Sequence, residues 1–222
     1  MTNSYIDVDK KIMSEIYTSS EPMDNLEVLC DVYGSRWPGT KEDVESANYM
    51  VERLKSYGID NAHIEKFKIP GWKRGTATLE VTSPIKKEFD VISLPFSIGG
   101  EVESDLVFLD AGHVDIYEKR KDEIDGNVVM VTSARPLGMT RSLHRSEKFM
   151  RSILAGAKGW IFMNHYAAYG PPTGGISPVI PSLGIAYEDG AFISRLLKRE
   201  GAVKVRIKTT DKNMVVDTHN VI

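Results

Sequence analysis

The sequence has little cysteine, little excess charge and no long apolar run. A single cysteine among 222 residues excludes an internal disulfide framework and a thiolate-rich zinc site. The 28 Lys and Arg against 31 Asp and Glu give a net charge of −3, which argues against a general nucleic-acid surface. No run approaches the ~18 apolar residues of a membrane span, and the first residues lack a basic-then-apolar export signal. We therefore expect a cytoplasmic protein with neither a membrane nor a nucleic-acid partner.

The first third of the chain has the pattern of helices. Hydrophobic residues make up 41% and charged residues 27%, the balance of a globular protein with a sizeable core. Residues 7–34 predict two helices, the second opening at Glu21-Pro22 with Cys30 on its buried face. A third helix is predicted from Thr40, with Asp43 in capping-box spacing, to Gly58. A strand over 62–69 follows and is expected to end at Pro70.

From residue 76 onward the sequence pattern changes, and short runs rich in β-forming residues are interrupted by two predicted helices. The helices are predicted at about 146–155 and 189–199, the second with Asp189 as its N-cap. The strands are predicted at 76–82, 89–94, 105–110, 127–133, 159–164, 183–186 and 202–208, with a last one from 214 towards 222. Helices followed by a mixed sheet with helices predict an α+β fold. Because the chain stops on apolar Val221-Ile222, we expect a polypeptide whose continuation is absent.

One pair of residues has the pattern of a metal site. His113 and Asp115 directly follow an apolar run, and a His-x-Asp at a strand end often begins a two-metal site. Such a site needs further ligands, and neither a Glu-Glu nor an Asp-Asp pair nor suitably spaced histidines accompany these two residues. We therefore favour an ordinary loop over a small metal hydrolase.

Two other candidates for chemistry also have simpler interpretations. Cys30 could be a nucleophile, but on a buried helix face it behaves as a small hydrophobe. A local basic cluster could receive an anionic group, but it reads more simply as a solvated charged loop. The cluster consists of Arg135, Arg141, His144, Arg145 and Lys148.

The loop after the second helix contains Arg36 and Trp37. An arginine fork beside an indole can grip a carboxylate or pack on a partner. We favour Trp37, together with Trp72, as residues that bury against a neighbouring domain. Arg36, Trp37 and Trp72 are thus the possible interdomain or substrate contacts.

A set of motifs, in order along the chain, resembles the di-zinc aminopeptidase and glutamate-carboxypeptidase-like metallopeptidases. Segments 34–40 (GSRWPGT), 54–60 (LKSYGID) and 70–75 (PGWKRG) resemble the start of that family's peptidase domain. The middle of the chain resembles the protease-associated (PA) domain that many members carry. Its similar segments are 124–131 (IDGNVVMV), 155–161 (AGAKGWI) and 180–190 (IPSLGIAYEDG), and 220–222 (NVI) resembles the strand that re-enters the peptidase domain.

The resemblance implies a domain organisation. Residues 1–74 would be helices and a strand of the peptidase domain, 75–211 a PA domain of the swivelling β/β/α type, and 212–222 a return strand. In the family, the metal ligands and catalytic residues all follow that strand. The resemblance therefore implies no catalytic or metal residue in this chain, and two zinc ions only in a full-length protein.

These expectations give one leading hypothesis and one alternative. The leading hypothesis is the non-catalytic N-terminal and PA portion of a zinc exopeptidase, aminopeptidase-like, that governs substrate access or domain assembly. Its partners would be the missing C-terminal catalytic domain, a peptide substrate in the full-length protein, and a second copy in a homodimer. This chain alone should be inactive. The alternative is a stand-alone PA-type module that binds peptides or proteins.

Overall fold

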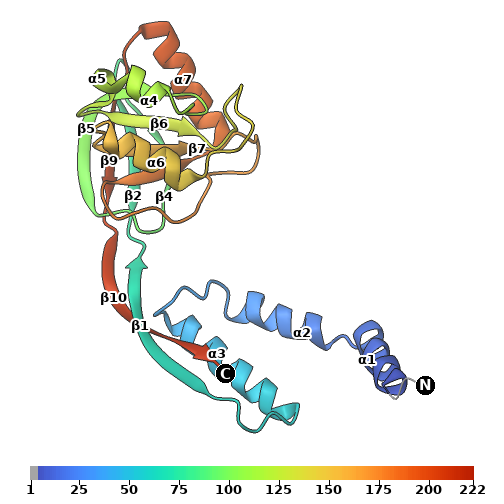
Figure 1. Ribbon diagram of the computed structural model, residues 1–222. Coiled ribbons are helices and arrows are strands. Elements are labelled where there is room, and N and C mark those ends of the chain that lie inside the picture. Colours follow the sequence, from blue (N-terminus) through green and yellow to red (C-terminus); the bar gives the residue numbers. More distant parts are fainter. Residues whose placement is uncertain (1–4) are drawn as a thin grey trace. The chain divides into compact units, whose positions relative to one another are not determined.

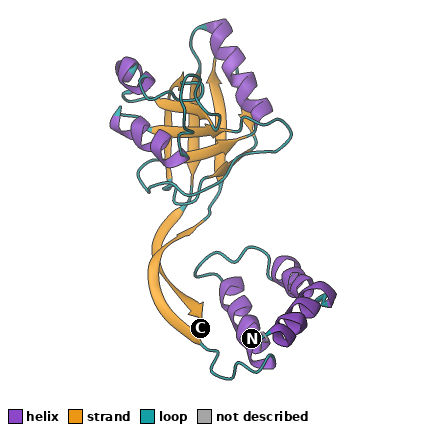
Figure 2. Cartoon of the chain, turned by 45° about the vertical axis from the view of Figure 1, so that its right-hand side comes forward, coloured by secondary structure: helices purple, strands orange, loops and turns teal. Residues whose placement is uncertain are grey.

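The computed structural model describes residues 5–222, which form two compact units. Unit 1 contains the described residues up to Ile69 together with Val215–Ile222, and unit 2 contains Pro70–Met214. Helices come first and a mixed sheet with helices follows (Figures 1 and 2), so the predicted α+β class is confirmed. The predicted boundaries at 74/75 and 211/212, and the assignment of the middle part to a PA domain, stay predictions. No helix in the described part is long and apolar enough to cross a membrane.

Unit 1 begins with helices that bury almost nothing. These are α1 (Ile6–Thr18), α2 (Glu21–Glu27), the π-helical segment η1 (Val28–Val32) and α3 (Lys41–Ser56). None of the residues of α1, α2 or η1 is buried. The prediction that Cys30 is buried is wrong: Cys30 is exposed, as are Met23 and Leu26 of the same predicted stripe, because no described residue covers this helix face.

The start of α3 agrees with the predicted capping box. The Thr40 hydroxyl accepts a hydrogen bond from the backbone N–H of Asp43 at 3.2 Å. The Asp43 carboxylate accepts one from the N–H of Gly39 at 3.0 Å. One open donor of the helix is thus satisfied, and the Asp43 carboxylate reaches back to the residue before the N-cap.

Strands β1 (Ile64–Lys73) and β10 (Lys212–Val221) form a two-stranded sheet that runs from unit 1 to unit 2. His63 and Ile222 exchange backbone hydrogen bonds of 2.7 and 2.9 Å at its far end. The prediction that the first strand ends at Pro70 is wrong, because β1 continues to Lys73. A strand with only one neighbour tolerates proline, since the edge facing away needs no donor.

Unit 2 contains an eight-stranded sheet in the order β3-β2-β9-β5-β6-β7-β8-β4. Its strands are β2 (Ala77–Ser83), β3 (Lys87–Phe89), β4 (Val91–Ser93), β5 (Gly100–Phe108), β6 (Val128–Thr132), β7 (Gly159–Met163), β8 (Ser182–Ile185) and β9 (Lys204–Thr209). The strand predicted at 89–94 is two strands, broken at Asp90. These two strands lie at opposite ends of the sheet order although one residue separates them, so the sheet must close on itself (Figure 2).

Four helices accompany this sheet: α4 (Ile116–Lys119), α5 (Lys121–Ile124), α6 (Arg145–Leu154) and α7 (Tyr187–Glu200). The two short ones, α4 and α5, were not predicted. The prediction that Asp189 caps α7 is wrong: the helix starts two residues earlier, the N-cap is Ala186, and no side chain caps it. Asp189 lies in the first turn, where its negative charge still favours the helix dipole.

Strands β5 to β8 run parallel, and β6, β7 and β8 are buried almost throughout. Parallel strands that are covered on both faces have mostly apolar sequences, as β6, β7 and β8 have. One core cluster includes Ile193 and Leu196 of α7, and the other includes Phe149 of α6, stacked edge-on against Trp160. The predicted alternation of the 202–208 strand is confirmed, with Val205 and Ile207 fully buried.

Candidate functional site

The Arg36–Trp37 loop is closed by its own arginine. The Arg36 guanidinium donates to the carbonyl oxygens of Leu29 and, at 2.9 Å, Gly34. It therefore holds the start of η1 against the loop, and its side chain remains exposed. Trp37 beside it is half-buried. A contact of either residue with a partner stays a prediction.

Trp72 belongs to unit 2, whereas Arg36 and Trp37 belong to unit 1. Its indole is buried, and Nε1 donates to the carbonyl of Ser97 at 3.2 Å. The Arg74 guanidinium lies over the ring, 5.2 Å from its centroid. Trp72 thus helps to attach the end of β1 to the loop after β4.

His113 and Asp115 lie in the loop between β5 and α4. The nearest distance from the imidazole Nδ1 to the Asp115 carboxylate is 3.8 Å, and that ring atom also accepts from the Asp115 N–H at 3.3 Å. Across residues 5–222, no three His, Cys, Asp or Glu side chains gather in a way that could hold a metal ion. The described residues therefore do not fit a two-zinc site, and we assign no hydrolytic step to them.

The interpretation of the basic cluster as a solvated loop is wrong for Lys148. Lys148 is fully buried, and its ammonium donates to the carbonyls of Thr132 and Ala134 at 2.8 and 2.6 Å. Burial without a carboxylate lowers the pKa of Lys148 to about 8. The amphipathic spacing of α6 did not reveal this, because a lysine beside an apolar face usually extends to solvent.

Three other members of the basic cluster also have partners in unit 2. The Arg145 guanidinium donates to the carbonyl of Gly175 at 3.0 and 2.9 Å. Arg141 forms a two-pronged pair with Glu147 at 2.7 and 3.0 Å, and Arg151 also bonds Glu147. These bonds lower the pKa of the Glu147 carboxyl to about 2. His144 is the N-cap of α6, accepting from the N–H of Ser146. Most of the cluster thus organises its own loop.

A polar pair that sequence reasoning missed lies at the carboxyl ends of β6 and β7. The Ser133 hydroxyl and His165 Nδ1 are 2.6 Å apart, and the hydroxyl also accepts from the His165 N–H at 3.1 Å. Lys148 binds the carbonyls on either side of Ser133, so it fixes the backbone that presents this hydroxyl. Ser133 directly follows β6 and His165 comes two residues after β7, and ligands often bind at such ends of parallel strands. That placement was the available signal.

Asp211 is a second buried polar group that the sequence did not reveal. It is 5% exposed, and Oδ1 accepts from the Gly75 N–H at 2.7 Å and from the Ser93 hydroxyl at 2.9 Å. Its other oxygen, Oδ2, is buried and has no partner within the described chain. Asp211 thus ties the segment after β1 to β4, at the place where the chain enters and leaves the eight-stranded sheet.

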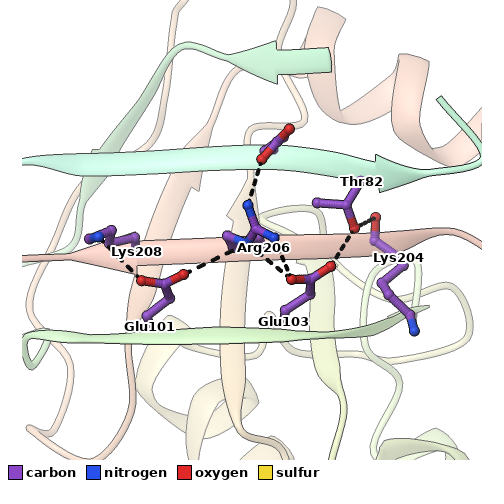
Figure 3. A network of polar contacts seen from close by, with 7 residues as sticks. Thr82, Glu101, Glu103, Lys204, Arg206 and Lys208 are labelled. Carbon is purple, nitrogen blue, oxygen red and sulfur yellow. Dashed lines mark hydrogen bonds and ion pairs between the residues drawn. The ribbon is translucent and has the colours of Figure 1, made fainter. Parts of the chain in front are cut away.

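The outer face of β2, β9 and β5 carries a network of opposite charges (Figure 3). Arg206 at its centre lies 3.1 Å from Glu80 and 2.7 Å from Glu103, and Lys208 lies 3.2 Å from Glu101. Hydrogen bonds from Arg206 and then from Thr82 lower the pKa of the Glu103 carboxyl. Because these charges neutralise one another, this face offers no concentrated charge of one sign to a ligand.

Comparisons with known proteins give the context for these features. No model of a protein family matches the sequence. Carboxypeptidase Q of Bos taurus is 26% identical to it over 94% of this chain and 47% of that protein. Carboxypeptidase Q of Mus musculus is 23% identical over 92% of this chain and 46% of that protein. The chain thus spans about half the length of the curated relatives it matches.

Solved structures share the fold. A peptidase M28 precursor from Shewanella amazonensis superposes with a TM-score of 0.76 and 20% identity, over 97% of this chain and 52% of that one. A zinc aminopeptidase from Bacillus subtilis gives a TM-score of 0.65 and 19% identity, over 87% and 44%. Together the comparisons confirm the resemblance that the motifs indicated: over nearly all its length, this chain is similar to about half of a zinc metallopeptidase.

Proposed function

We propose that this chain is the non-catalytic portion of a zinc-dependent, aminopeptidase-like exopeptidase. In this proposal, unit 1 attaches to a catalytic half supplied by further polypeptide. Unit 2 acts as a PA-type domain that limits which peptides enter. The two zinc ions and the catalytic residues belong to that other half.

The observation that carries the proposal is the exposure of apolar side chains in unit 1. Those on the first two helices include five that are exposed by between 46% and 63%: Ile12, Met13, Ile16, Met23 and Leu26. Apolar side chains at helical spacing normally face a core, and large exposed patches mark interaction sites. A second polypeptide segment that covers these helices would explain their composition.

The β1–β10 sheet supports the same conclusion. Two strands in isolation are marginally stable in water, and each leaves one edge of unpaired backbone groups. Val215 on β10 is 70% exposed. A further strand added to this sheet would pair the open edge and cover such side chains.

The test begins with the gene and ends with the complex. We expect the reading frame beyond codon 222, or a neighbouring one, to encode a His-x-Asp and later a Glu-Glu segment. Co-expressed with that segment, the chain should form a stoichiometric complex that holds zinc and releases amino acids from peptides. The chain alone should show neither property, by metal analysis and by peptide hydrolysis.

A pair of variants tests the role of unit 1. Leu26→Lys should prevent assembly of the complex, because a charge in an apolar interface is costly. Leu137→Lys is the matched control, since Leu137 is 96% exposed in unit 2 and the change should leave assembly intact. Zinc binding together with peptide cleavage by the chain alone would contradict the proposal. A monomeric chain that needs no second segment would instead indicate a stand-alone module.

A further inference from the structure

Three helices of unit 2 border a hollow in its surface. Tyr117 of α4, Ile124 of α5 and Phe149 of α6 belong to one core cluster, so the three helices cover the same face of the sheet (Figure 1). Between them lies an open hollow of about 420 Å³, which is within the size range of small-molecule sites. We propose that this hollow, which we call the α4–α6 hollow, binds a free α-amino acid with an aliphatic side chain. The proposal concerns unit 2 alone and does not rest on the proposed function.

One part of the lining is apolar. Tyr117 and Ala155 are buried, and Val114 is half-buried. Leu154, in the last turn of α6, is 77% exposed although Phe149 of the same helix is fully buried. An aliphatic group placed against Leu154 and Val114 would remove apolar surface from water, which is favourable. The hollow therefore offers a place for the side chain of a ligand.

The lining also contains two opposite charges that do not pair with each other. Glu118 and Lys121 are three residues apart, a spacing that brings side chains together on a continuous helix. Here the helix is interrupted: α4 ends at Lys119, α5 begins at Lys121, and Arg120 between them has φ −115° and ψ 23°. In the described part of the chain, no ion pair or hydrogen bond engages the side chain of Glu118 or Lys121, and both are exposed at the hollow.

The charges next to them in sequence are engaged elsewhere. The Lys119 ammonium lies 3.9 Å from the Asp115 carboxylate, and the Arg120 guanidinium lies 2.7 Å from the Glu123 carboxylate. These four residues do not line the hollow. The hollow therefore presents one carboxylate and one ammonium that a ligand can engage without breaking an existing pair.

Arg151 adds positive charge on the α6 side of the hollow. Its guanidinium pairs with the Glu147 carboxylate at 3.0 Å, but Arg141 pairs with the same carboxylate at 2.7 Å. One negative charge shared by two guanidinium groups leaves one positive charge in excess. Lys121 and Arg151 can therefore both attract a carboxylate, whereas Glu118 can attract an ammonium.

The charges and the apolar surface together select the ligand. An α-amino acid carries a carboxylate, an ammonium and a side chain on one carbon atom, so it can meet all three parts of the hollow at once. A simple carboxylate would leave Glu118 without a partner and facing a like charge. A phosphate ester, which carries more negative charge, would be repelled more strongly by Glu118. A simple amine would face the excess positive charge of Lys121 and Arg151.

Saturation-transfer NMR with the full chain and L-leucine tests the site, because this measurement also detects weak binding to large or self-associated proteins. The hollow is open, so we expect saturable binding with an affinity on the order of 1 mM. Two analogues each lack one charge: isocaproate has no ammonium, and leucinamide has no carboxylate. Each should bind about threefold more weakly than leucine or worse, a loss typical of a partly exposed charge pair.

Charge-removing variants assign each group of the ligand to its partner. Lys121→Gln should weaken leucine about threefold and bind leucinamide, which lacks the carboxylate, no more weakly than before. Glu118→Gln should weaken leucine by a similar factor and bind isocaproate no more weakly. Lys198→Gln, at an exposed site on α7, is the matched control and should change neither affinity. Unchanged thermal unfolding will verify the fold of each variant.

The apolar contact is tested separately. Leu154→Ala should weaken leucine, isocaproate and leucinamide alike, because all three carry the same aliphatic group. Leu137→Ala is the matched control, since Leu137 is 96% exposed and does not line the hollow, and binding should not change.

Any of four results would overturn the proposal. The first is the absence of saturable transfer to leucine. The second is an analogue that binds as tightly as leucine, because the hollow would then not recognise both charges. The third is unchanged leucine affinity in Lys121→Gln or Glu118→Gln, which would place binding elsewhere. The fourth is tighter binding of the dipeptide glycyl-leucine, which would assign the hollow to the end of a polypeptide.

Discussion

Lys148 shows what a single buried cation does to unit 2. Its ammonium satisfies two backbone carbonyls at the end of β6 but has no ion-pair partner among the described residues. The fold therefore tolerates the protonated form poorly and the neutral form better. Both forms can donate to the two carbonyls, so the geometry is compatible with either.

A pH dependence of stability follows from this lysine. Its pKa is about 8 in the folded chain against 10.5 in the unfolded reference, so between these values the unfolded state binds more protons. Stability should therefore rise with pH across this window, relative to Lys148→Met, which lacks the titrating group. Urea unfolding of both proteins from pH 7 to 10 measures the difference. Lys158→Met, at an exposed site, should keep the wild-type dependence, and parallel curves for Lys148→Met would contradict the assignment.

Asp211 acts through its two short hydrogen bonds. Asp211→Ala would leave the Gly75 N–H and the Ser93 hydroxyl without their acceptor, so we expect a loss of about 3 kcal/mol in unfolding free energy. Asp211→Asn should lose less, because the amide oxygen can accept the same two bonds. Thermal and urea unfolding measure both. Asp105→Ala, at an exposed position, is the control and should change stability by less than about 0.5 kcal/mol.

At the scale of elements, the charged face of β2, β9 and β5 makes a measurable prediction. Arg206→Gln should raise the pKa of Glu103 towards its usual value, because the bonds from Arg206 are the main cause of its lowering. Carboxyl NMR titration measures this change, and added salt should shrink the difference between the proteins. Arg199→Gln, at the exposed end of α7, should leave Glu103 unchanged. An unchanged Glu103 in Arg206→Gln would show that the ion pairs in Figure 3 are not populated in solution.

The elements also show what the sequence could predict. Periodicity located the three longest helices of unit 1 and unit 2 within a few residues, and alternation identified the inward face of β9. The division of the predicted 89–94 strand at Asp90 could not be predicted from the sequence. It depends on how the two ends of the sheet come together in the folded protein. The short helices α4 and α5 lack the length that makes a periodic pattern visible.

The site was harder to predict than the fold. The conspicuous residues His113 and Asp115 gather no further metal ligands within the described chain. By contrast, Ser133 and His165 are unremarkable in the sequence, and they come together with Lys148 only because β6, β7 and α6 are neighbours. Their relation is set by strand order, which spacing along the chain does not encode.

At the scale of the whole molecule, the exposed apolar residues of α1 and α2 should make the isolated chain self-associate. We expect a dimer or a larger species whose mass, by light scattering, falls on dilution. Ile12→Lys with Leu26→Lys should shift the population to monomer, since both side chains are exposed and the fold does not need them. Ile85→Lys, on an exposed residue of unit 2, is the control. A monomer at all concentrations in the unaltered chain would contradict this expectation.

The pairing of β1 with β10 has a consequence for how the chain is connected. The two strands are direct neighbours, and beyond them Thr210 donates to Thr76 at 3.0 Å to continue the pairing into β9 and β2. Residues 74–211 connect β1 to β10, in the position that a turn occupies in a β-hairpin. The eight-stranded sheet is thus an insertion between two paired strands, and the chain enters and leaves it at neighbouring points.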